Sequence, residues 1–130
     1  MEGIYEMVDL IYKDEAFQII GVCMDVHGLL GGGFLEIVYK DAIEYEFRRR
    51  GVPFQREKEY DISYKDIILP HKYYADFVVF KKIILEVKAV DGIVDEFIKR
   101  TINYLAVSKC KLGLIVNFGK EKLTYKRIVL

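Results

Sequence analysis

Hydrophobic and polar positions along the chain follow two different periods. Between residues 13 and 27, apolar side chains recur at the spacing of one helix face, and a second helical stretch runs from about 33 to 50, where Gly51 follows a run of arginines. After Val52 and Pro53 the apolar positions alternate with a period of two, which is typical of β-strands. The pattern therefore predicts two helices followed by strands.

The predicted strands are rich in β-branched and aromatic residues and are separated by short polar or glycine-containing turns. They cover residues 54–64, a strand that begins at 67–69, and residues 73–80, 83–90, 112–117 and about 123–129. A third helix is predicted over 95–108, with a buried side formed by Phe97, Ile98, Thr101, Ile102, Leu105 and Ala106. This order of elements predicts a single mixed α/β domain over 1–130, built on a central sheet.

Composition agrees with one globular domain and narrows the class of function. The chain has 130 residues, of which 52% are hydrophobic. Lysine and arginine together number 20, and so do aspartate and glutamate, which gives a formal net charge of +0. This balance argues against a protein that coats nucleic acid through bulk positive charge, but it allows an enzyme that gathers basic residues around an acidic site.

Cysteine usage and the N-terminal residues indicate the compartment. Cys23 and Cys110 are too few for a disulfide framework and lack zinc-site spacing, so buried free thiols are expected. Residues 1–6 are acidic and lack the apolar run of a signal peptide or a membrane span. We therefore expect a cytoplasmic protein that does not enter a membrane.

The two strongest predicted strands form a hairpin that carries acidic residues. Strand alternation puts Glu86 and Lys88 on one face of the second strand, and one face of the first is expected to hold Tyr74, Asp76, Val78 and Phe80. A tight connection centred on Lys81 places Asp76 opposite Glu86, with their Cβ atoms about 5 Å apart. Opposed carboxylates in an enclosed site repel unless a cation neutralises them, and Mg²⁺ prefers such oxygen ligands. With a connection two residues longer, Asp76 instead faces Lys88 in an ordinary ion pair.

The second predicted helix adds a third acidic residue. Glu36, Tyr39 and Ile43 lie on one helix face, so Glu36 points either towards the sheet as a third acidic ligand or towards its own helix N-terminus. Tyr39 can hydrogen-bond the site, or it can pack in the core with its hydroxyl satisfied. Gly33 is expected to allow the tight entry into the helix.

These motifs resemble a known group of enzymes. Asp76 followed by Glu86-Val87-Lys88 on a hairpin resembles the PD-(D/E)XK nuclease superfamily, and the stretch 33–39, Gly-Phe-Leu-Glu-Ile-Val-Tyr, resembles the motif of the GxxExxY family. The resemblance implies a restriction-endonuclease-like αβββαβ core, with a central mixed sheet flanked by helices. It also implies a Mg²⁺- or Mn²⁺-dependent nuclease acting on nucleic acid, with DNA expected, in which Glu36, Asp76 and Glu86 bind the metal and Lys88 serves catalysis.

The third predicted helix departs from the related pattern. Related nucleases of the exonuclease-like branch carry Gln-x-x-x-Tyr on this helix, and here Arg100 occupies the Gln position while Tyr104 fits. The resemblance therefore gives Tyr39, Arg100 and Tyr104 as the expected substrate-binding residues. Arg100 either binds a substrate phosphate or pairs with the acidic cluster, takes the place of the metal and weakens the enzyme.

Other residues and functions carry weaker signals. His27 is expected to pack or cap rather than to bind a metal, and His71 is expected in a solvated loop. A non-catalytic nucleic-acid- or protein-binding module that keeps the nuclease fold remains an alternative to the enzyme. A homodimer formed through the tyrosine-rich segment 60–74 is a further possibility.

Overall fold

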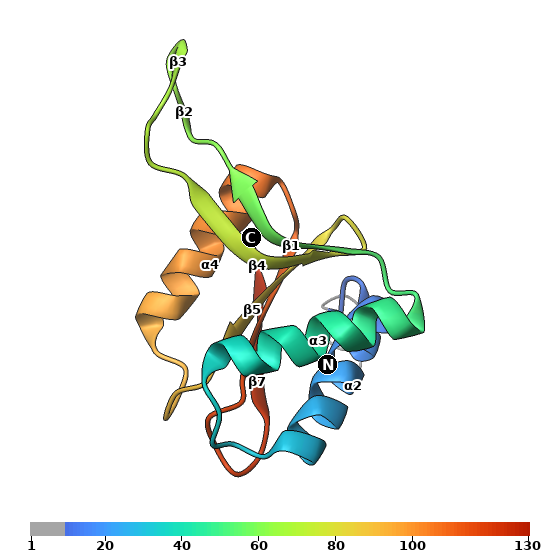
Figure 1. Ribbon diagram of the computed structural model, residues 1–130. Coiled ribbons are helices and arrows are strands. Elements are labelled where there is room, and N and C mark those ends of the chain that lie inside the picture. Colours follow the sequence, from blue (N-terminus) through green and yellow to red (C-terminus); the bar gives the residue numbers. More distant parts are fainter. Residues whose placement is uncertain (1–9) are drawn as a thin grey trace, which may run out of the picture.

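A computed structural model describes residues 10–130, so the acidic stretch at 1–6 lies outside the described residues. The chain order (Figure 1) is α2 (Lys13–Leu30), α3 (Glu36–Arg50), β1 (Phe54–Tyr60), β2 (Ser63–Tyr64), β3 (Ile67–Ile68), β4 (Tyr73–Val79), β5 (Ile83–Lys88), α4 (Asp95–Ser108), β6 (Leu112–Asn117) and β7 (Thr124–Val129).

Five of the strands form one mixed sheet in the order β1-β4-β5-β6-β7. Neighbours in it are antiparallel except β5 and β6, which run parallel, with α4 as the connection between them. A parallel pair needs such a crossover, because its second strand must start at the same end as the first. The predicted mixed α/β architecture is therefore confirmed.

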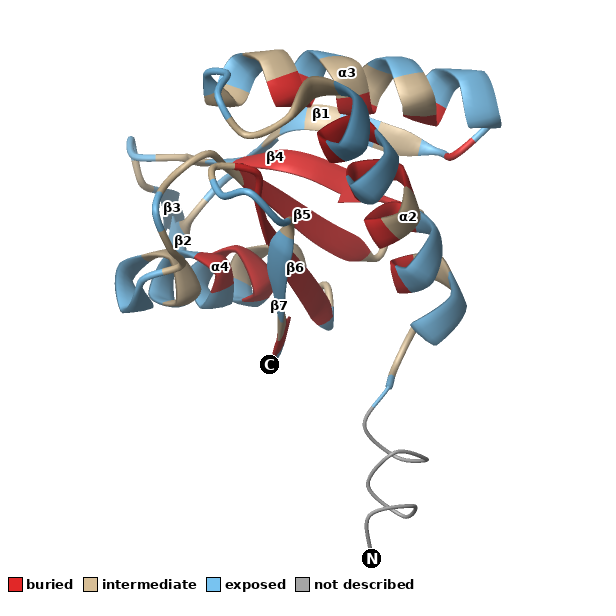
Figure 2. Cartoon of the chain, turned by 90° about the horizontal axis from the view of Figure 1, so that it is seen from below, coloured by how far each residue is buried: buried red, intermediate tan, exposed pale blue. Residues whose placement is uncertain are grey.

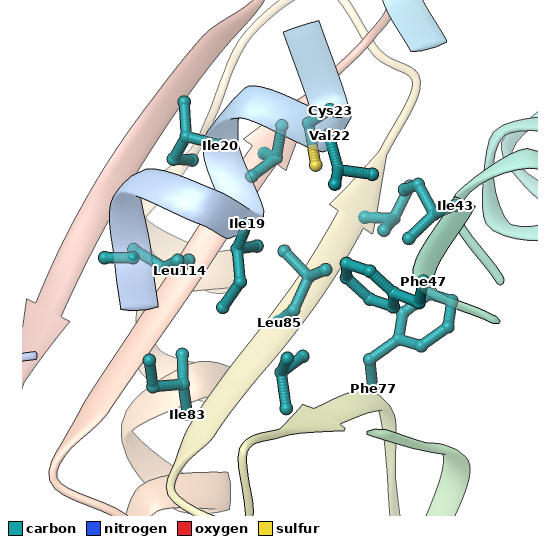
Figure 3. Packing of buried hydrophobic residues seen from close by; sticks show 14 of the residues in the cluster. Ile19, Ile20, Val22, Cys23, Ile43, Phe47, Phe77, Ile83, Leu85 and Leu114 are labelled. Carbon is teal, nitrogen blue, oxygen red and sulfur yellow. The ribbon is translucent and has the colours of Figure 1, made fainter. Parts of the chain in front are cut away.

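Helices cover both faces of the sheet and bury the central strands, coloured red in Figure 2. On one face, α2 and α3 pack on alternate residues of β4, β5 and β6; Figure 3 shows Ile19, Cys23 and Phe47 of these helices against Phe77 and Leu85 of the strands. On the other face, α4 packs in a smaller cluster that includes Ala75, Val78, Ile84, Tyr104, Leu105 and Ile115. Between the two layers, the central strands are hydrophobic on both faces.

The helix ends differ from the predicted boundaries for local reasons. The first helix continues past His27 to Leu30 and ends at Gly31, whose φ of 74° favours glycine. Gly32 must also be glycine, because a Cβ there would lie 2.7 Å from the Lys120 carbonyl oxygen. The second helix begins at Glu36. The expectation that Gly33 is needed for a tight entry into this helix is wrong, since Gly33 has no positive φ and a Cβ there would meet nothing within 4 Å.

The predicted buried side of the third helix is partly wrong. Thr101 and Leu105 are buried as expected, but Ile102 is 37% exposed and Ala106 is also exposed, whereas Tyr104 is buried. The buried stripe therefore includes Tyr104, which has a polar hydroxyl, and this helix face lies beside the candidate site described below.

The long predicted strand over 54–64 divides after Tyr60. The chain leaves the sheet there and forms the β2–β3 hairpin, which extends away from the body of the molecule in Figure 1. Tyr64, Ile67 and Ile68 at its end are 55–58% exposed. The predicted homodimer through 60–74 stays a prediction.

The cysteines lie in different surroundings. Cys23 on α2 is completely buried, and Cys110 between α4 and β6 is half-buried; both are free thiols. Burial raises the pKa of the Cys23 thiol far above its ordinary range. None of the helices in residues 10–130 has the length and apolar character needed to cross a membrane.

Candidate active site

The β4–β5 hairpin has the register that the sequence predicts. Phe77 pairs with Leu85 and Val79 with Ile83, so the next position in the same register sets Asp76 opposite Glu86. At that position the two carboxylates bridge the strands: the Asp76 N–H donates to Glu86 Oε2 at 2.8 Å, and the Val87 N–H donates to Asp76 Oδ2 at 2.8 Å. The hairpin opens here and the carboxylates fill the opening.

A second irregularity lies on the other side of Asp76, in β1. The β1–β4 ladder pairs Arg56 with Phe77 and Lys58 with Ala75, but it omits Glu57, which stands opposite Asp76. Glu57 has a φ of 53°, a left-handed conformation that a residue with a side chain adopts only at a cost. Both strands are therefore locally distorted at the same level.

The distortion changes the direction in which β4 side chains point. Ala75 and Val78 belong to the same buried cluster, although strict alternation would send them to opposite faces. The expectation that Tyr74, Asp76, Val78 and Phe80 share one face is therefore wrong, since Val78 packs in the cluster under α4 and Phe80 against the cluster under α2 and α3. The alternation shifts its phase between Ala75 and Val78, at the level of Asp76. This shift lets Asp76 contact a side chain of α3, the helix on the face of the sheet opposite to α4.

That side chain belongs to Lys40, a residue absent from the motifs that predict the site. Lys40 is 7% exposed, and its Nζ donates to Asp76 Oδ1 at 2.9 Å and to Glu57 Oε1. Burial opposes its charge, but the hydrogen bonds that it donates to Glu57 and Asp76 outweigh burial and raise the pKa of Lys40. Its spacing was a usable signal, since it follows Glu36 by four residues and so lies one turn along the same face.

Glu36 lies in the first turn of α3 and is half-buried near the same carboxylates. Burial and then the charge of Asp76 raise its pKa, and Lys88 and Lys40 partly offset that rise. Burial disfavours the charged carboxylate, and the charge of Asp76 acts in the same direction. Glu36 has no hydrogen bond or ion pair with Asp76 in the described residues, so its role beside the acidic pair stays a prediction.

Glu86 is the most deeply buried acid of the site, at 3% exposed. Burial and then the charge of Asp76 raise the pKa of the Glu86 carboxyl well above its ordinary value of 4.5. The hydrogen bond from the Asp76 amide and the charges of Lys88 and Lys40 only partly oppose this. A carboxyl held in this way favours either a proton or a further cation.

Lys88 stands at the end of β5, with its ammonium 4.7 Å from the centre of the Phe97 ring of α4. Asn117, completely buried at the end of β6, holds the chain that follows Lys88. Its Oδ1 accepts from the Val90 amide and its Nδ2 donates to the Val90 carbonyl. Asn117 is thus a positioning residue for the end of β5.

The three expected substrate-binding residues have different surroundings. Arg100 is exposed on α4 and has no ion pair with an acidic residue in the described part of the chain, so it does not take the metal's place on the acidic cluster. Tyr104, one turn further, is buried; burial and then Glu86 raise its pKa to about 12. Tyr39 is fully buried, and its hydroxyl donates to the Gly31 carbonyl at 2.5 Å rather than to the site.

The histidines agree with their expected structural roles. His27 is buried, and its Nε2 lies 2.9 Å from the Lys120 carbonyl oxygen. His71 is exposed beside Tyr73, with 5.6 Å between the ring centres.

The donor chemistry of the site fits a hard divalent cation. Asp76 and Glu86 face each other as oxygen donors, and the Lys40 ammonium is the species that stands in for a cation against Asp76 Oδ1. Within residues 10–130, no three His, Cys, Asp or Glu side chains are grouped closely enough to hold one ion. A site with two carboxylates is still compatible with Mg²⁺, which commonly keeps waters and substrate phosphate in its other positions. Glu36 as a third ligand stays a prediction.

The hairpin thus carries two opposed carboxylates at its opening, with Lys88 on the same strand as Glu86. A family model described as the PD-(D/E)XK nuclease superfamily matches residues 13–128, and the chain belongs to this superfamily. The match supports a nuclease function at this level, whereas the narrower GxxExxY assignment stays an expectation. A search of curated proteins found no match.

One solved structure supports the fold independently. It is entitled "Crystal structure of SSO0001" and is similar to this chain with a TM-score of 0.58 and 17% sequence identity, over 71% of this chain and 48% of that one. At this identity the likeness shows the fold alone, and the present chain spans about half the length of that protein. The predicted restriction-endonuclease-like core is confirmed, with α3, β1, β4, β5, α4 and β6 forming its αβββαβ order.

Proposed function

We propose that the protein is a divalent-metal-dependent nuclease that hydrolyses phosphodiester bonds, with DNA as substrate. The observation that carries the proposal is the pair of opposed, buried carboxylates of Asp76 and Glu86, one of which already binds a cationic group, Lys40. Such a pair is costly to bury, and a cation removes most of the cost.

Each residue has a distinct expected task. Asp76 and Glu86 would hold Mg²⁺ or Mn²⁺, which when bound polarises the phosphate and lowers the pKa of a bound water. Lys88 would stabilise charge that develops on the phosphate or orient the attacking water, from a position fixed by Asn117. Arg100, exposed on α4 one turn before Tyr104, would contact a neighbouring substrate phosphate.

The direct test is cleavage of single-stranded, double-stranded and branched DNA by the purified protein, with Mg²⁺ or Mn²⁺ and with EDTA. We expect metal-dependent products that fall about 100-fold or more in Asp76→Asn and Lys88→Met. The matched control is Glu121→Gln, an exposed acid on the loop before β7, which should cleave like the wild type. Arg100→Gln should weaken DNA binding severalfold. The slope of the logarithm of DNA affinity against the logarithm of salt concentration should fall by about 1, the value for one lost phosphate contact.

The outcomes separate the enzyme from the alternative module. A pure protein that binds DNA but cleaves none of these substrates with either metal would contradict the enzyme and favour the non-catalytic module. A clear gain of cleavage in Arg100→Gln would show that Arg100 obstructs the site instead of binding phosphate.

A further inference from the structure

Lys40 lies between the carboxylate that we expect to bind metal and a second acid at the surface. Its Nζ touches Asp76, whose side chain is 13% exposed, and Glu57, whose side chain is 49% exposed. A buried ammonium is stable only when such partners replace its water. The two partners thus mark an inner and an outer position for the same cation.

On Asp76, the ammonium occupies the oxygen that an ion would need. Oδ2 of Asp76 accepts from the Val87 amide, while Oδ1 is the oxygen that binds Lys40. An ion that binds Asp76 through Oδ1 must therefore compete with Lys40. Mg²⁺ carries twice the charge of the ammonium and binds carboxylate oxygen directly, so it is a suitable competitor.

The backbone of β1 is arranged to supply the outer partner. Glu57 has its left-handed φ of 53° where the ladder opposite Asp76 is interrupted, yet pairing continues on both sides without a change of register. A non-glycine residue in this conformation costs about 1–3 kcal/mol, so neighbouring contacts must maintain it. The contact between Glu57 and Lys40 is one that this conformation makes possible.

From these contacts we infer that Lys40 is a resident counter-cation of the metal-free site, which a divalent ion displaces from Asp76 while Glu57 retains it. This inference rests on the proposed function, because it concerns the same metal. It assigns Lys40 and Glu57 as a pair that sets the metal affinity. Lys40 keeps Asp76 neutralised until metal arrives, and Glu57 receives the ammonium when it leaves.

The test is a calorimetric titration of Mn²⁺ and Mg²⁺ into the wild type, Lys40→Met and Lys88→Met. Lys88 is the matched control, since it acts on Glu86 through space but its ammonium lies over Phe97. Metal binds only the fraction of the protein in which Asp76 is free of Lys40, so removing Lys40 raises the apparent metal affinity by the inverse of that fraction. We expect an increase of roughly tenfold or more for Lys40→Met. For Lys88→Met we expect a much smaller gain.

The role of Glu57 is tested by the change Glu57→Gln, made once in the wild type and once in Lys40→Met. Glu57→Gln should weaken metal binding when Lys40 is present and should have little effect in Lys40→Met, because Glu57 acts through Lys40. An equal effect in both backgrounds would mean that Glu57 acts on the metal by charge alone, which overturns its role as the receiving partner.

A second test uses the wild type alone and so does not depend on the stability of any variant. Crystals of the wild type soaked in Mn²⁺ should show Lys40 Nζ away from Asp76 Oδ1 and still on Glu57. An ion bound by Asp76 and Glu86 with Lys40 remaining 2.9 Å from Oδ1 would overturn the displacement but leave the nuclease proposal standing. Equal affinities in Lys40→Met and Lys88→Met would do the same. If no variant binds either ion, the metal-dependent function itself fails, and the displacement with it.

Discussion

At the scale of single residues, the carboxyl groups of Asp76 and Glu86 cannot turn away from each other. Each accepts a hydrogen bond from a backbone amide at the opening of the hairpin: Glu86 from the amide of Asp76, and Asp76 from the amide of Val87. When both are ionised, their repulsion is a cost of the metal-free fold, and the Lys40 ammonium on Asp76 reduces it.

The raised pKa of Glu86 makes stability depend on pH in a definite direction. Between its ordinary value of 4.5 and its raised folded value, the folded protein binds the Glu86 proton more tightly than the unfolded chain does. This contribution is fully present below 4.5, declines as pH rises through that window, and is lost above the folded pKa. Glu86→Gln lacks this titration, so in EDTA the free energy of unfolding of the wild type should fall relative to that of Glu86→Gln as pH rises. The expected change in this difference is about 1.4 kcal/mol for each unit by which folding raises the pKa.

Urea unfolding at intervals from pH 4.5 to 9 measures this difference. Glu121→Gln, an exposed acid, serves as the control and should run parallel to the wild type. A constant difference between Glu86→Gln and the wild type across the range would contradict the raised pKa.

Sequence patterns identify Asp76 and Glu86, and the spacing from Glu36 puts Lys40 on the same helix face, but no pattern predicts the contact of Lys40 with Glu57. The pairing of Asp76 with Glu86 follows from a short connection within one hairpin, and local rules determine such a connection. The contact of Lys40 with Glu57 joins a helix to a strand, at a residue whose left-handed backbone no intrinsic preference of glutamate predicts. The contact depends on tertiary packing.

At the scale of elements, the position of α4 depends on a close approach to β6. A Cβ built on Gly113 would lie 2.6 Å from Cγ2 of Thr101, so the helix could not sit as near to the sheet with any other residue there. The side chain of Thr101 is fixed by a hydrogen bond from its Oγ1 to the Phe97 carbonyl. Because α4 also carries Tyr104 and Phe97, this contact sets the wall of the candidate site.

Gly113→Ala should therefore destabilise the protein by about 1–3 kcal/mol, through overpacking against Thr101. The companion change Thr101→Ser removes the obstructing methyl group, and the double mutant should recover part of the loss, with a coupling of about 0.5–3 kcal/mol. Thermal unfolding of all four proteins gives the cycle. Gly21→Ala, in α2 with open space at its Cβ, is the control and should stabilise by about 0.5–1 kcal/mol. Additive effects of the two changes would contradict the contact.

The elements themselves were largely predictable, since their periods of hydrophobicity are strong. The helix over 95–108 and the strand over 112–117 have their predicted bounds. The errors lie where the backbone leaves a regular period, as at Tyr60, where the chain departs into the β2–β3 hairpin, and at Asp76, where alternation changes phase. The period of a pattern does not reveal such interruptions, because the side chains on either side still fit it.

At the scale of the whole molecule, the described chain divides into a body and a projecting hairpin. Tyr60 and Tyr73 are paired at the base of the projection, while Tyr64, Ile67 and Ile68 near its end are more than half exposed. Burial of apolar surface is the main source of folding stability, so this hairpin contributes little to the body.

Replacing residues 61–72 by Asn-Gly should therefore leave the fold intact. Tyr60 and Tyr73 already face each other, and a two-residue turn with these residues closes such a pair. We expect the far-ultraviolet circular dichroism spectrum of the shortened protein to show the same helices and the same five-stranded sheet. We also expect a midpoint of thermal unfolding within a few degrees of that of the wild type. Unfolding of the shortened chain would contradict this.

The same variant tests the predicted homodimer. Sedimentation of both proteins at several concentrations should show loss of any dimer when the hairpin is removed. A dimer that persists in the shortened protein would place the contact elsewhere.

The unequal surroundings of the two thiols make the natural sequence suitable for attaching a spectroscopic reporter. Cys23 has no exposed surface and a disfavoured thiolate, so we expect it not to react with maleimide reagents in the folded state. Cys110 is half-buried where α4 leads into β6, and a fluorophore would attach there first. Displacements of α4 on loading with metal or DNA could then be followed by fluorescence without introducing or removing a cysteine.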